Sequence, residues 1–305
     1  FFILIPAGHI WKFVTLAYIP PTIAGVVLAY RKKYLLGGIV TALFIALQIQ
    51  SNHIQMSYYF MFVILFFVGA YFEDAYRKKE LPHFFKASGV LALAAVVGVC
   101  INISNLYHTY EYSKETMRGK SELKQEGAAA SQTSSGLDRD YITNWSYGIG
   151  ETFSLLVPNV KGGASVPLSR SEKAMEKANP MYSSLYSQLT QYFGDQPMTS
   201  GPVYVGAFVL MLFILGCFIV KGPMKWALLG ATIFSILLSW GKNFMGLTDF
   251  FIDYIPMYNK FRAVSSILVI AEFTIPLLAI FTLKEILTKP ELLKEKLKYI
   301  YISFG

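Results

Sequence analysis

A short polar stretch between two apolar segments carries groups suited to binding a sugar or a phosphate. It reads S-N-H-I-Q-M-S-Y-Y over residues 51–59, and Asn52, His53 and Gln55 supply its hydrogen-bond donors and acceptors. Polar side chains cost less at a membrane boundary than at its centre, so a plain helix-hairpin turn anchored by tyrosines also fits this position. The residue types make Asn52, His53 and Gln55 candidate substrate-binding residues, with the structural turn as the alternative.

A second candidate is the basic stretch Y-N-K-F-R at residues 258–262, which precedes a long apolar run. Arg262 is suited to bidentate hydrogen bonds with a phosphate group, whereas Lys260 acts as a point charge. An anionic lipid headgroup or a lipid-phosphate substrate would suit both residues. The alternative is that both side chains simply reach toward the phosphates of the bilayer.

Aromatic and polar residues gather in a third stretch, Y-I-T-N-W-S-Y-G-I-G-E-T-F-S-L-L-V-P at residues 141–158. Trp145 and Tyr147 could stack on sugar rings, while Asn144 and Glu151 could bond sugar hydroxyls. Packing of this loop onto neighbouring helices accounts for the same residues equally well.

Acidic residues supply two weaker candidates. Glu272 lies inside an apolar run, where a carboxylate is costly unless it is paired or protonated. It would serve a proton relay or a helix–helix hydrogen bond, and its candidate partners are Gln48, Asn102 and Asn105.

The triplet Asp138-Arg139-Asp140 matches the acid-x-acid pattern of many metal-dependent sugar transferases. It is a candidate divalent-metal pair, although Arg139 between the two acids would neutralise them. His9, His83 and His108 stand alone in the sequence. We therefore assign no metal site and no cofactor beyond this candidate pair.

Composition places these residues in a membrane protein. Of the 305 residues, 54% are hydrophobic and only 15% are charged, whereas soluble domains carry about 25% charged residues. Residues 106–200 have a net charge of −1, and the remainder has +9. The positive excess lies in short connections between apolar runs, a pattern of membrane topology rather than of nucleic-acid binding.

We expect an all-α membrane protein, a polytopic bundle of about seven transmembrane helices with one large extracytoplasmic loop. Pro20 and Pro21 predict a kink in the first helix. Basic clusters follow the first, third, fifth and seventh apolar runs, which places all four on the cytoplasmic face. The runs cover residues 13–30, 34–50, 58–72, 87–106, 203–220, 226–240 and 264–286.

This pattern divides the chain into three parts. Residues 1–106 hold the first four helices, residues 107–200 the extracytoplasmic loop, and residues 201–305 the last three helices with the start of a cytoplasmic connection. Within the loop, residues 114–135 are expected to be flexible or helical. The sequence opens without a Met and ends just after an apolar run begins at Tyr299, so we expect an internal piece of a longer chain.

The chain resembles the YfhO family of bacterial multi-pass membrane proteins, which are similar to the C-type (GT-C) glycosyltransferase superfamily. The resemblance covers most of the sequence and rests on four stretches, at residues 51–59, 145–159, 193–206 and 258–266. It departs at Ala263-Val264-Ser265, where many relatives carry a proline and a second arginine.

The resemblance implies transfer of a sugar from a polyprenyl-phosphate donor to an acceptor on the outer face of the bacterial plasma membrane. In the superfamily the catalytic carboxylate lies in the first outer loop, a part that we expect this sequence to lack, so no catalytic residue is assigned. Arg262 matches the family's basic position and is the implied ligand of the donor phosphate, while His53 and Gln55 match its polar outer turn. The alternatives are a lipid or polysaccharide transporter or flippase, and a non-catalytic membrane assembly protein.

Overall fold

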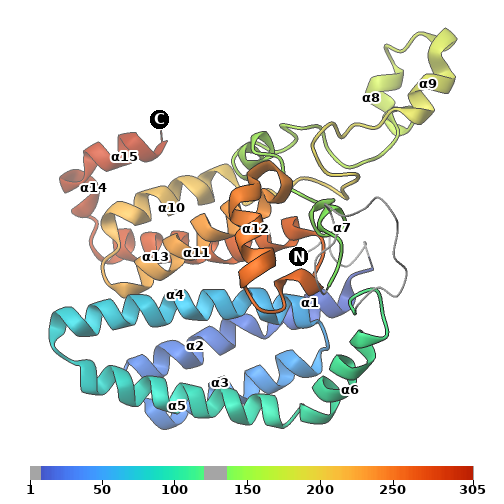
Figure 1. Ribbon diagram of the computed structural model, residues 1–305. Helices are drawn as coiled ribbons and strands as arrows, with labels where there is room; N and C mark the ends of the chain where they lie inside the picture. The colour runs from blue at the N-terminus through green and yellow to red at the C-terminus, as the bar shows by residue number, and fades with distance from the viewer. Residues whose placement is uncertain (1–7, 120–135, 305) are drawn as a thin grey trace.

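The computed structural model describes residues 8–119 and 136–304, and the chain in these ranges is mostly helical. Within them the only β-type pairing is an isolated bridge between Pro167 and Thr190. The helices form an N-terminal and a C-terminal group, which lie side by side (Figure 1). Residues 136–206, which we call the polar region, lie between the two groups in sequence and cover one end of the bundle (Figure 1).

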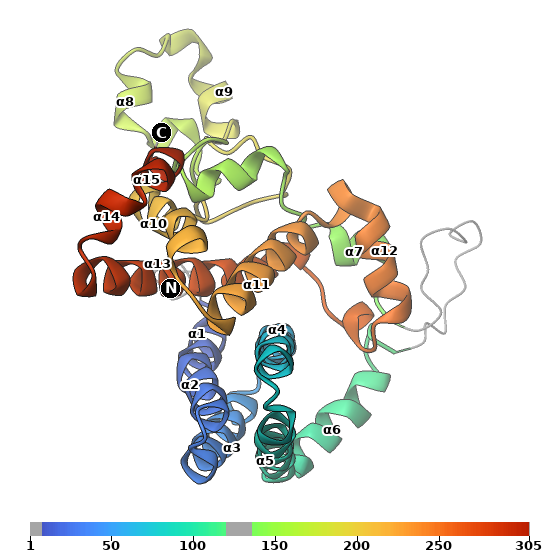
Figure 2. The same ribbon diagram turned by 90° about the vertical axis from the view of Figure 1, so that its left-hand side faces the viewer.

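The first group holds the N-terminal helices. Its contacts centre on α2, α3 and α5, which lie side by side in both views (Figures 1 and 2). The bounds are α1 Ile10–Ala17, α2 Ile19–Tyr30, α3 Tyr34–Gln50, α4 Ile54–Lys78, α5 Leu81–Cys100 and α6 Ile103–Lys114.

Small residues allow α2 and α3 to approach closely. A Cβ atom on Gly37 would lie 2.5 Å from the backbone nitrogen of Ala29, and a Cβ on Gly25 would lie 2.4 Å from the hydroxyl of Thr41. Backbone packing at small residues is the usual way for helices to associate inside a membrane. These two glycines therefore fix the spacing between α2 and α3.

The expected irregularity near the proline pair takes the form of a break between α1 and α2. Pro20 and Pro21 occupy the first turn of α2, where an absent backbone N–H leaves no hydrogen bond unmade. The interruption is at Tyr18, two residues before Pro20 and between the end of α1 and the start of α2. The prolines thus begin a new helical segment.

The second group holds the C-terminal helices and contacts the first mainly where α11 packs on α4. In this group α13 packs against both α10 and α11, and α15 folds back along α10, with the rings of Phe218 and Tyr299 stacked 4.6 Å apart. The bounds are α10 Ala207–Ile219, α11 Pro223–Ser239, α12 Met245–Tyr254, α13 Val269–Thr288, α14 Leu292–Glu295 and α15 Leu297–Phe304.

Several helices fit a multi-pass membrane protein. In the described ranges four are long and apolar enough to cross a bilayer: Ile10–Tyr30, Ile54–Lys78, Leu81–Cys100 and Val264–Thr288. A fifth is obtained if the pair Pro223–Ser239 and Gly241–Tyr254, bent by 107°, counts as one. The remaining expected spans correspond to shorter apolar helices, α3 and α10, so the number seven stays a prediction.

The four basic clusters meet at one end of the bundle. Arg31, Lys78, Lys221 and Lys284, one from each cluster, line a single pocket. We call this the basic end, and the opposite end, where the polar region lies, the loop end. The four clusters therefore lie at the same end of the bundle, and the assignment of that end to the cytoplasm stays a prediction.

The polar region is built from short helices and packed turns. The segment around α7 (Arg139–Thr143) and the 3-10 helix η1 (Gly150–Leu155) packs on the loop end, where Ile142, Tyr147 and Leu155 are buried. The short helices α8 (Glu172–Met175) and α9 (Ser183–Gln188) project away from the bundle (Figure 1). Most of the stretch 114–135 lies outside the described residues.

Candidate functional site

A cavity of about 890 Å³ opens at the loop end of the bundle. It lies where the start of α1, the turn between α3 and α4, the polar region and the segment before α13 meet. We call it the outer cavity. Its lining residues are His9, Lys12, His53, Gln55, Trp145, Ala164, Ser165, Val166, Gln196, Met198, Thr199, Ser200, Arg262, Ala263, Ser265 and Ser266.

The turn at residues 51–59 is tied directly to the basic stretch before α13. Asn52 has a φ of 58°, which reverses the chain sharply so that His53 precedes α4 and Gln55 lies in its first turn. The amide nitrogen of Gln55 donates to the backbone oxygen of Arg262 at 2.7 Å, and the Tyr58 hydroxyl donates to the backbone oxygen of Pro256 at 2.8 Å. Two candidate motifs that are two hundred residues apart in sequence therefore form one wall.

Aromatic rings hold the side chain of Arg262. Its guanidinium lies 5.2 Å from the ring centre of Tyr141 and 5.8 Å from that of Trp145, and it donates a hydrogen bond to the Tyr141 hydroxyl. The backbone is fixed as well, since Ser265 N–H donates to the Trp145 carbonyl oxygen at 3.0 Å. Among the described residues Arg262 forms no ion pair with a carboxylate. Its charge is therefore available to an anion in the cavity.

Two residues of this cavity, His9 and Lys12, were not among the sequence candidates. His9 looked isolated in the sequence, yet it lines the same cavity as His53. Lys12 is a cation near the loop end of an apolar run, the same signal that singled out Arg262. Applying that argument to every helix end would have found Lys12, whereas nothing in the sequence placed His9 beside His53.

The cavity is positively charged and its histidines are neutral at pH 7. Lys12 and Arg262 contribute two cations, and no Asp or Glu is found among the lining residues in the described parts of the chain. Burial, and secondarily the charge of Lys12, lowers the pKa of His53 from 6.5 to about 4. Burial lowers the pKa of His9 as well. The arrangement suits an anionic group held by Lys12 and Arg262, beside uncharged imidazoles.

One atom of His53 is left without a partner. Its Nδ1 is buried and forms no hydrogen bond within the described residues. A buried nitrogen without a partner is unfavourable unless a ligand or water satisfies it. His53 thus offers a ligand in the outer cavity a buried nitrogen whose hydrogen bond is unmade among the described residues.

Glu151 is the centre of a buried hydrogen-bond cluster rather than part of the outer cavity. It is only 3% exposed, and its carboxylate accepts hydrogen bonds from the Gly148 N–H (2.6 Å), the Tyr192 hydroxyl (2.5 Å) and the Asp195 N–H (3.3 Å). Burial, with the Glu151 bond, raises the pKa of Tyr192. These bonds join residues 148–151 to residues 192–195 and hold the polar region together.

The other predicted site residues lie elsewhere. Tyr147 is buried, bonds Ser154, and lines a separate cavity of about 20 Å³ with Glu151. Asn52 and Asn144 are exposed and outside both cavities. Lys260 also lies outside them and donates to the backbone oxygen of Arg118 at 2.7 Å. The structure thus brings His53, Gln55, Trp145 and Arg262 together and separates them from the other five.

The acidic candidates have structural surroundings. Asp138 caps α7 by accepting from the Asp140 N–H, and Arg139 pairs with Asp249 and Asp253 instead of neutralising its sequence neighbours. In the described ranges no group of three or more His, Cys, Asp or Glu residues is arranged to hold a metal ion.

No hydrogen bond joins Glu272 to any of its three suggested partners, because two of them bind other groups and the third lies on α3. The side-chain nitrogen of Asn102 donates to Ala46 and Gly98 carbonyl oxygens, and that of Asn105 reaches the Asn52 side chain at 3.5 Å. Gln48 is buried on α3, in the other helix group from α13, and no bond joins it to Glu272. Glu272 itself is partly buried on α13.

Comparison of the chain with models of protein families, with characterised proteins and with solved structures found no match.

Proposed function

We propose that this protein is a membrane glycosyltransferase of the C-type class, acting at the outer face of a bacterial plasma membrane. It transfers a sugar from a polyprenyl-phosphate donor to an acceptor, and the outer cavity binds the donor. The single observation that supports this most strongly is the pairing of two cations, Lys12 and Arg262, in a cavity rich in hydroxyl and amide groups.

The lining chemistry matches both parts of such a donor. Phosphate is recognised by a guanidinium through paired hydrogen bonds and by an ammonium through charge, and the cavity offers one of each. Trp145 offers an aromatic face for a sugar ring, and Ser165, Gln196 and Thr199 offer hydrogen bonds for its hydroxyls. The opening of the cavity beside membrane helices suits a donor whose prenyl chain stays in the bilayer.

The catalytic base stays unassigned. An inverting transfer needs a base near the acceptor hydroxyl. Within the described residues the cavity lining contains no carboxylate, and the imidazole of His53, uncharged at pH 7, has the capacity to accept a hydrogen bond from a ligand. We assign His53 and Gln55 to substrate binding and Arg262 and Lys12 to the donor phosphate.

We infer that the shorter helices α3 and α10 also cross the bilayer, so that seven crossings place the basic end in the cytoplasm and the polar region outside. Helices shorter than about 20 residues span by thinning the bilayer locally or by polar extension at their ends.

A transporter or flippase is the main alternative, and an assembly protein without a substrate is another. A transporter usually places its substrate near the bilayer midplane at broken helices in matched repeats. The outer cavity is instead lined by helix ends and connecting segments. This placement favours a reaction at the membrane surface.

The test is sugar transfer from radiolabelled polyprenyl-phosphate donors by the full-length protein in membrane vesicles. Arg262→Ala and Lys12→Ala should abolish most of the transfer at unchanged expression, while Lys260→Ala, which alters a neighbouring cation outside the cavity, should retain it. Absence of transfer with every donor, combined with lipid translocation in the same vesicles, would establish the transporter alternative.

A further inference from the structure

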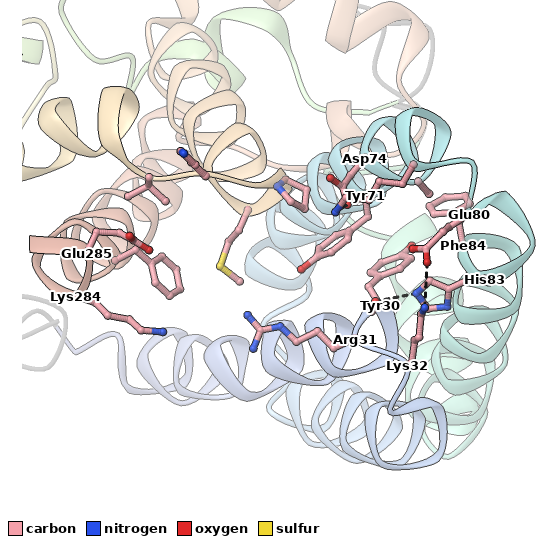
Figure 3. A pocket seen from close by; sticks show the side chains of 17 residues that line it. Tyr30, Arg31, Lys32, Tyr71, Asp74, Glu80, His83, Phe84, Lys284 and Glu285 are labelled. Atoms are coloured by element: carbon pink, nitrogen blue, oxygen red, sulfur yellow. Dashed lines mark hydrogen bonds and ion pairs between the residues drawn. The ribbon is translucent and has the colours of Figure 1, made fainter. Parts of the chain in front are cut away.

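A second pocket, of about 530 Å³, lies at the basic end between the two helix groups (Figure 3). We propose that this pocket binds a phosphate-bearing anion, either an anionic lipid headgroup or a soluble phosphate. It lies at the end of the bundle opposite the outer cavity and is independent of the proposed sugar transfer. We call it the basic-end pocket.

The charges of the pocket do not cancel. Lys32 pairs with Glu80 at 3.1 Å and Lys78 pairs with Asp74 at 2.7 Å, while the third acid, Glu285, is 3.6 Å from Lys289. These pairs account for all three lining acids. Three lining cations then remain.

The remaining cations are Arg31, Lys221 and Lys284, and none forms an ion pair within the described ranges. They come from three different places: the end of α2, the turn between α10 and α11, and α13. Figure 3 shows the side chains of Arg31 and Lys284 extending toward one another from opposite sides of the pocket. Like charges that converge on one hollow repel unless an anion lies between them.

An ordered aromatic wall fixes the position of Arg31. The Tyr30 ring stacks between Tyr71 at 4.5 Å and Phe84 at 5.6 Å. Nε2 of His83 donates to the Tyr30 carbonyl oxygen at 2.9 Å, as Figure 3 shows, and Nδ1 is hydrogen-bonded to the Tyr34 hydroxyl at 2.6 Å. The residue before Arg31 is thus held on both faces and at its backbone, which prepares the guanidinium for a ligand.

Topology alone does not explain this geometry. The positive-inside rule requires basic residues in cytoplasmic connections but does not require them to surround a cavity. Basic pockets between helices on this face are a known setting for phosphorylated lipid headgroups. Apolar Met224 and Phe281 line the same pocket and would contact the first carbons of a lipid.

The experiment measures binding to the full-length protein purified in an uncharged detergent. The probes are a fluorescent short-chain phosphatidic acid, inorganic pyrophosphate, and zwitterionic phosphatidylcholine as the control lipid. Arg31→Gln and Lys284→Gln should each weaken binding of the active probe about tenfold, a typical effect of losing one charge-assisted contact. Lys33→Gln removes a neighbouring cation that does not line the pocket and should leave the affinity unchanged.

Glu285→Gln provides a variant that should bind the anion more tightly than the parent protein. It removes a negative charge from the lining and should tighten binding about threefold through reduced repulsion. Binding of phosphatidic acid that responds to these variants identifies a lipid site, and the same response with pyrophosphate identifies a soluble ligand. No binding of either probe, or equal effects of Lys33→Gln and Lys284→Gln, would overturn the proposal.

Discussion

At the scale of single residues, Arg262 combines several contacts through its backbone and its side chain. Its backbone oxygen accepts from Gln55, its guanidinium lies on Tyr141 and Trp145, and its charge has no acidic partner among the described residues. A guanidinium held this way presents a fixed pair of donors.

Arg262→Lys should therefore weaken binding of polyprenyl phosphate about tenfold although the charge is kept, because the ammonium loses the paired geometry and the aromatic contacts. A binding titration with the purified protein measures this. Lys260→Arg serves as the matched control and should bind normally. Equal affinity of Arg262→Lys and the parent protein would remove Arg262 from the phosphate site.

His53 makes the stability of the protein dependent on pH. Its pKa is lowered from 6.5 to about 4, so the unfolded chain takes up a proton more readily than the folded protein. The contribution is fully present above pH 6.5 and should be lost progressively as the pH falls toward about 4. Thermal unfolding in detergent across this window should show a smaller pH dependence for His53→Gln than for the parent protein, and parallel curves would contradict the assignment.

Glu151 should matter for stability more than for ligand contact. Glu151→Ala leaves the buried Gly148 N–H and Tyr192 hydroxyl without their acceptor, which costs about 3 kcal/mol. We expect a lower unfolding temperature and faster proteolysis of the polar region at residues 150–200. Glu151→Gln, which keeps one acceptor oxygen, should be intermediate. Loss of ligand binding without loss of stability would show that Glu151 contacts the ligand.

At the scale of helices, the close contact of α2 with α3 depends on glycines, which have no side chain to separate the two backbones. Gly37→Ala places a methyl group 2.5 Å from a backbone nitrogen and should destabilise the protein by about 1–3 kcal/mol. Gly69→Ala is the matched control, since no atom lies within 4 Å of the added Cβ atom there. The measurement is the thermal unfolding temperature of the two variants. Equal values would mean that α2 and α3 move apart to admit the methyl group without loss of stability.

Helix connections also assemble the outer cavity. Met257 and Ala263 both have positive φ, at 66° and 57°, and they turn the chain twice before α13 begins. Non-glycine residues in this region are held there by their surroundings. Here the Ala263 N–H donates to the Ile142 carbonyl oxygen at 3.2 Å, which joins the strained turn to the polar region.

At the scale of the whole molecule, the two pockets lie at opposite ends of one bundle. The two pockets are lined by different parts of the chain. The outer cavity includes residues of the polar region, whereas the basic-end pocket includes a residue from each of the four basic clusters. The proposed topology therefore places the outer cavity outside the cell and the basic-end pocket inside it.

Cysteine labelling tests this orientation. After Cys100 and Cys217 are replaced by alanine, a cysteine at Ser184 should react with a membrane-impermeant maleimide in intact cells. A cysteine at Lys33, at the basic end, should react only after the cells are opened. The reverse pattern would invert the topology, and reaction of both in intact cells would exclude an odd number of crossings between them.

The sequence by itself determined the class of protein and the positions of its apolar helices, because hydrophobic length and the bias of basic residues are local properties. It also made Arg262, His53 and Gln55 candidate site residues from their types near helix ends. Tertiary structure decided which candidates lie together. Gln55 meets Arg262 only after two helix groups pack, and His9 and Lys12 join them from the start of α1. The structural role of Glu151 follows from its burial. Burial depends on contacts between segments far apart in the chain, and a local sequence pattern does not contain those contacts.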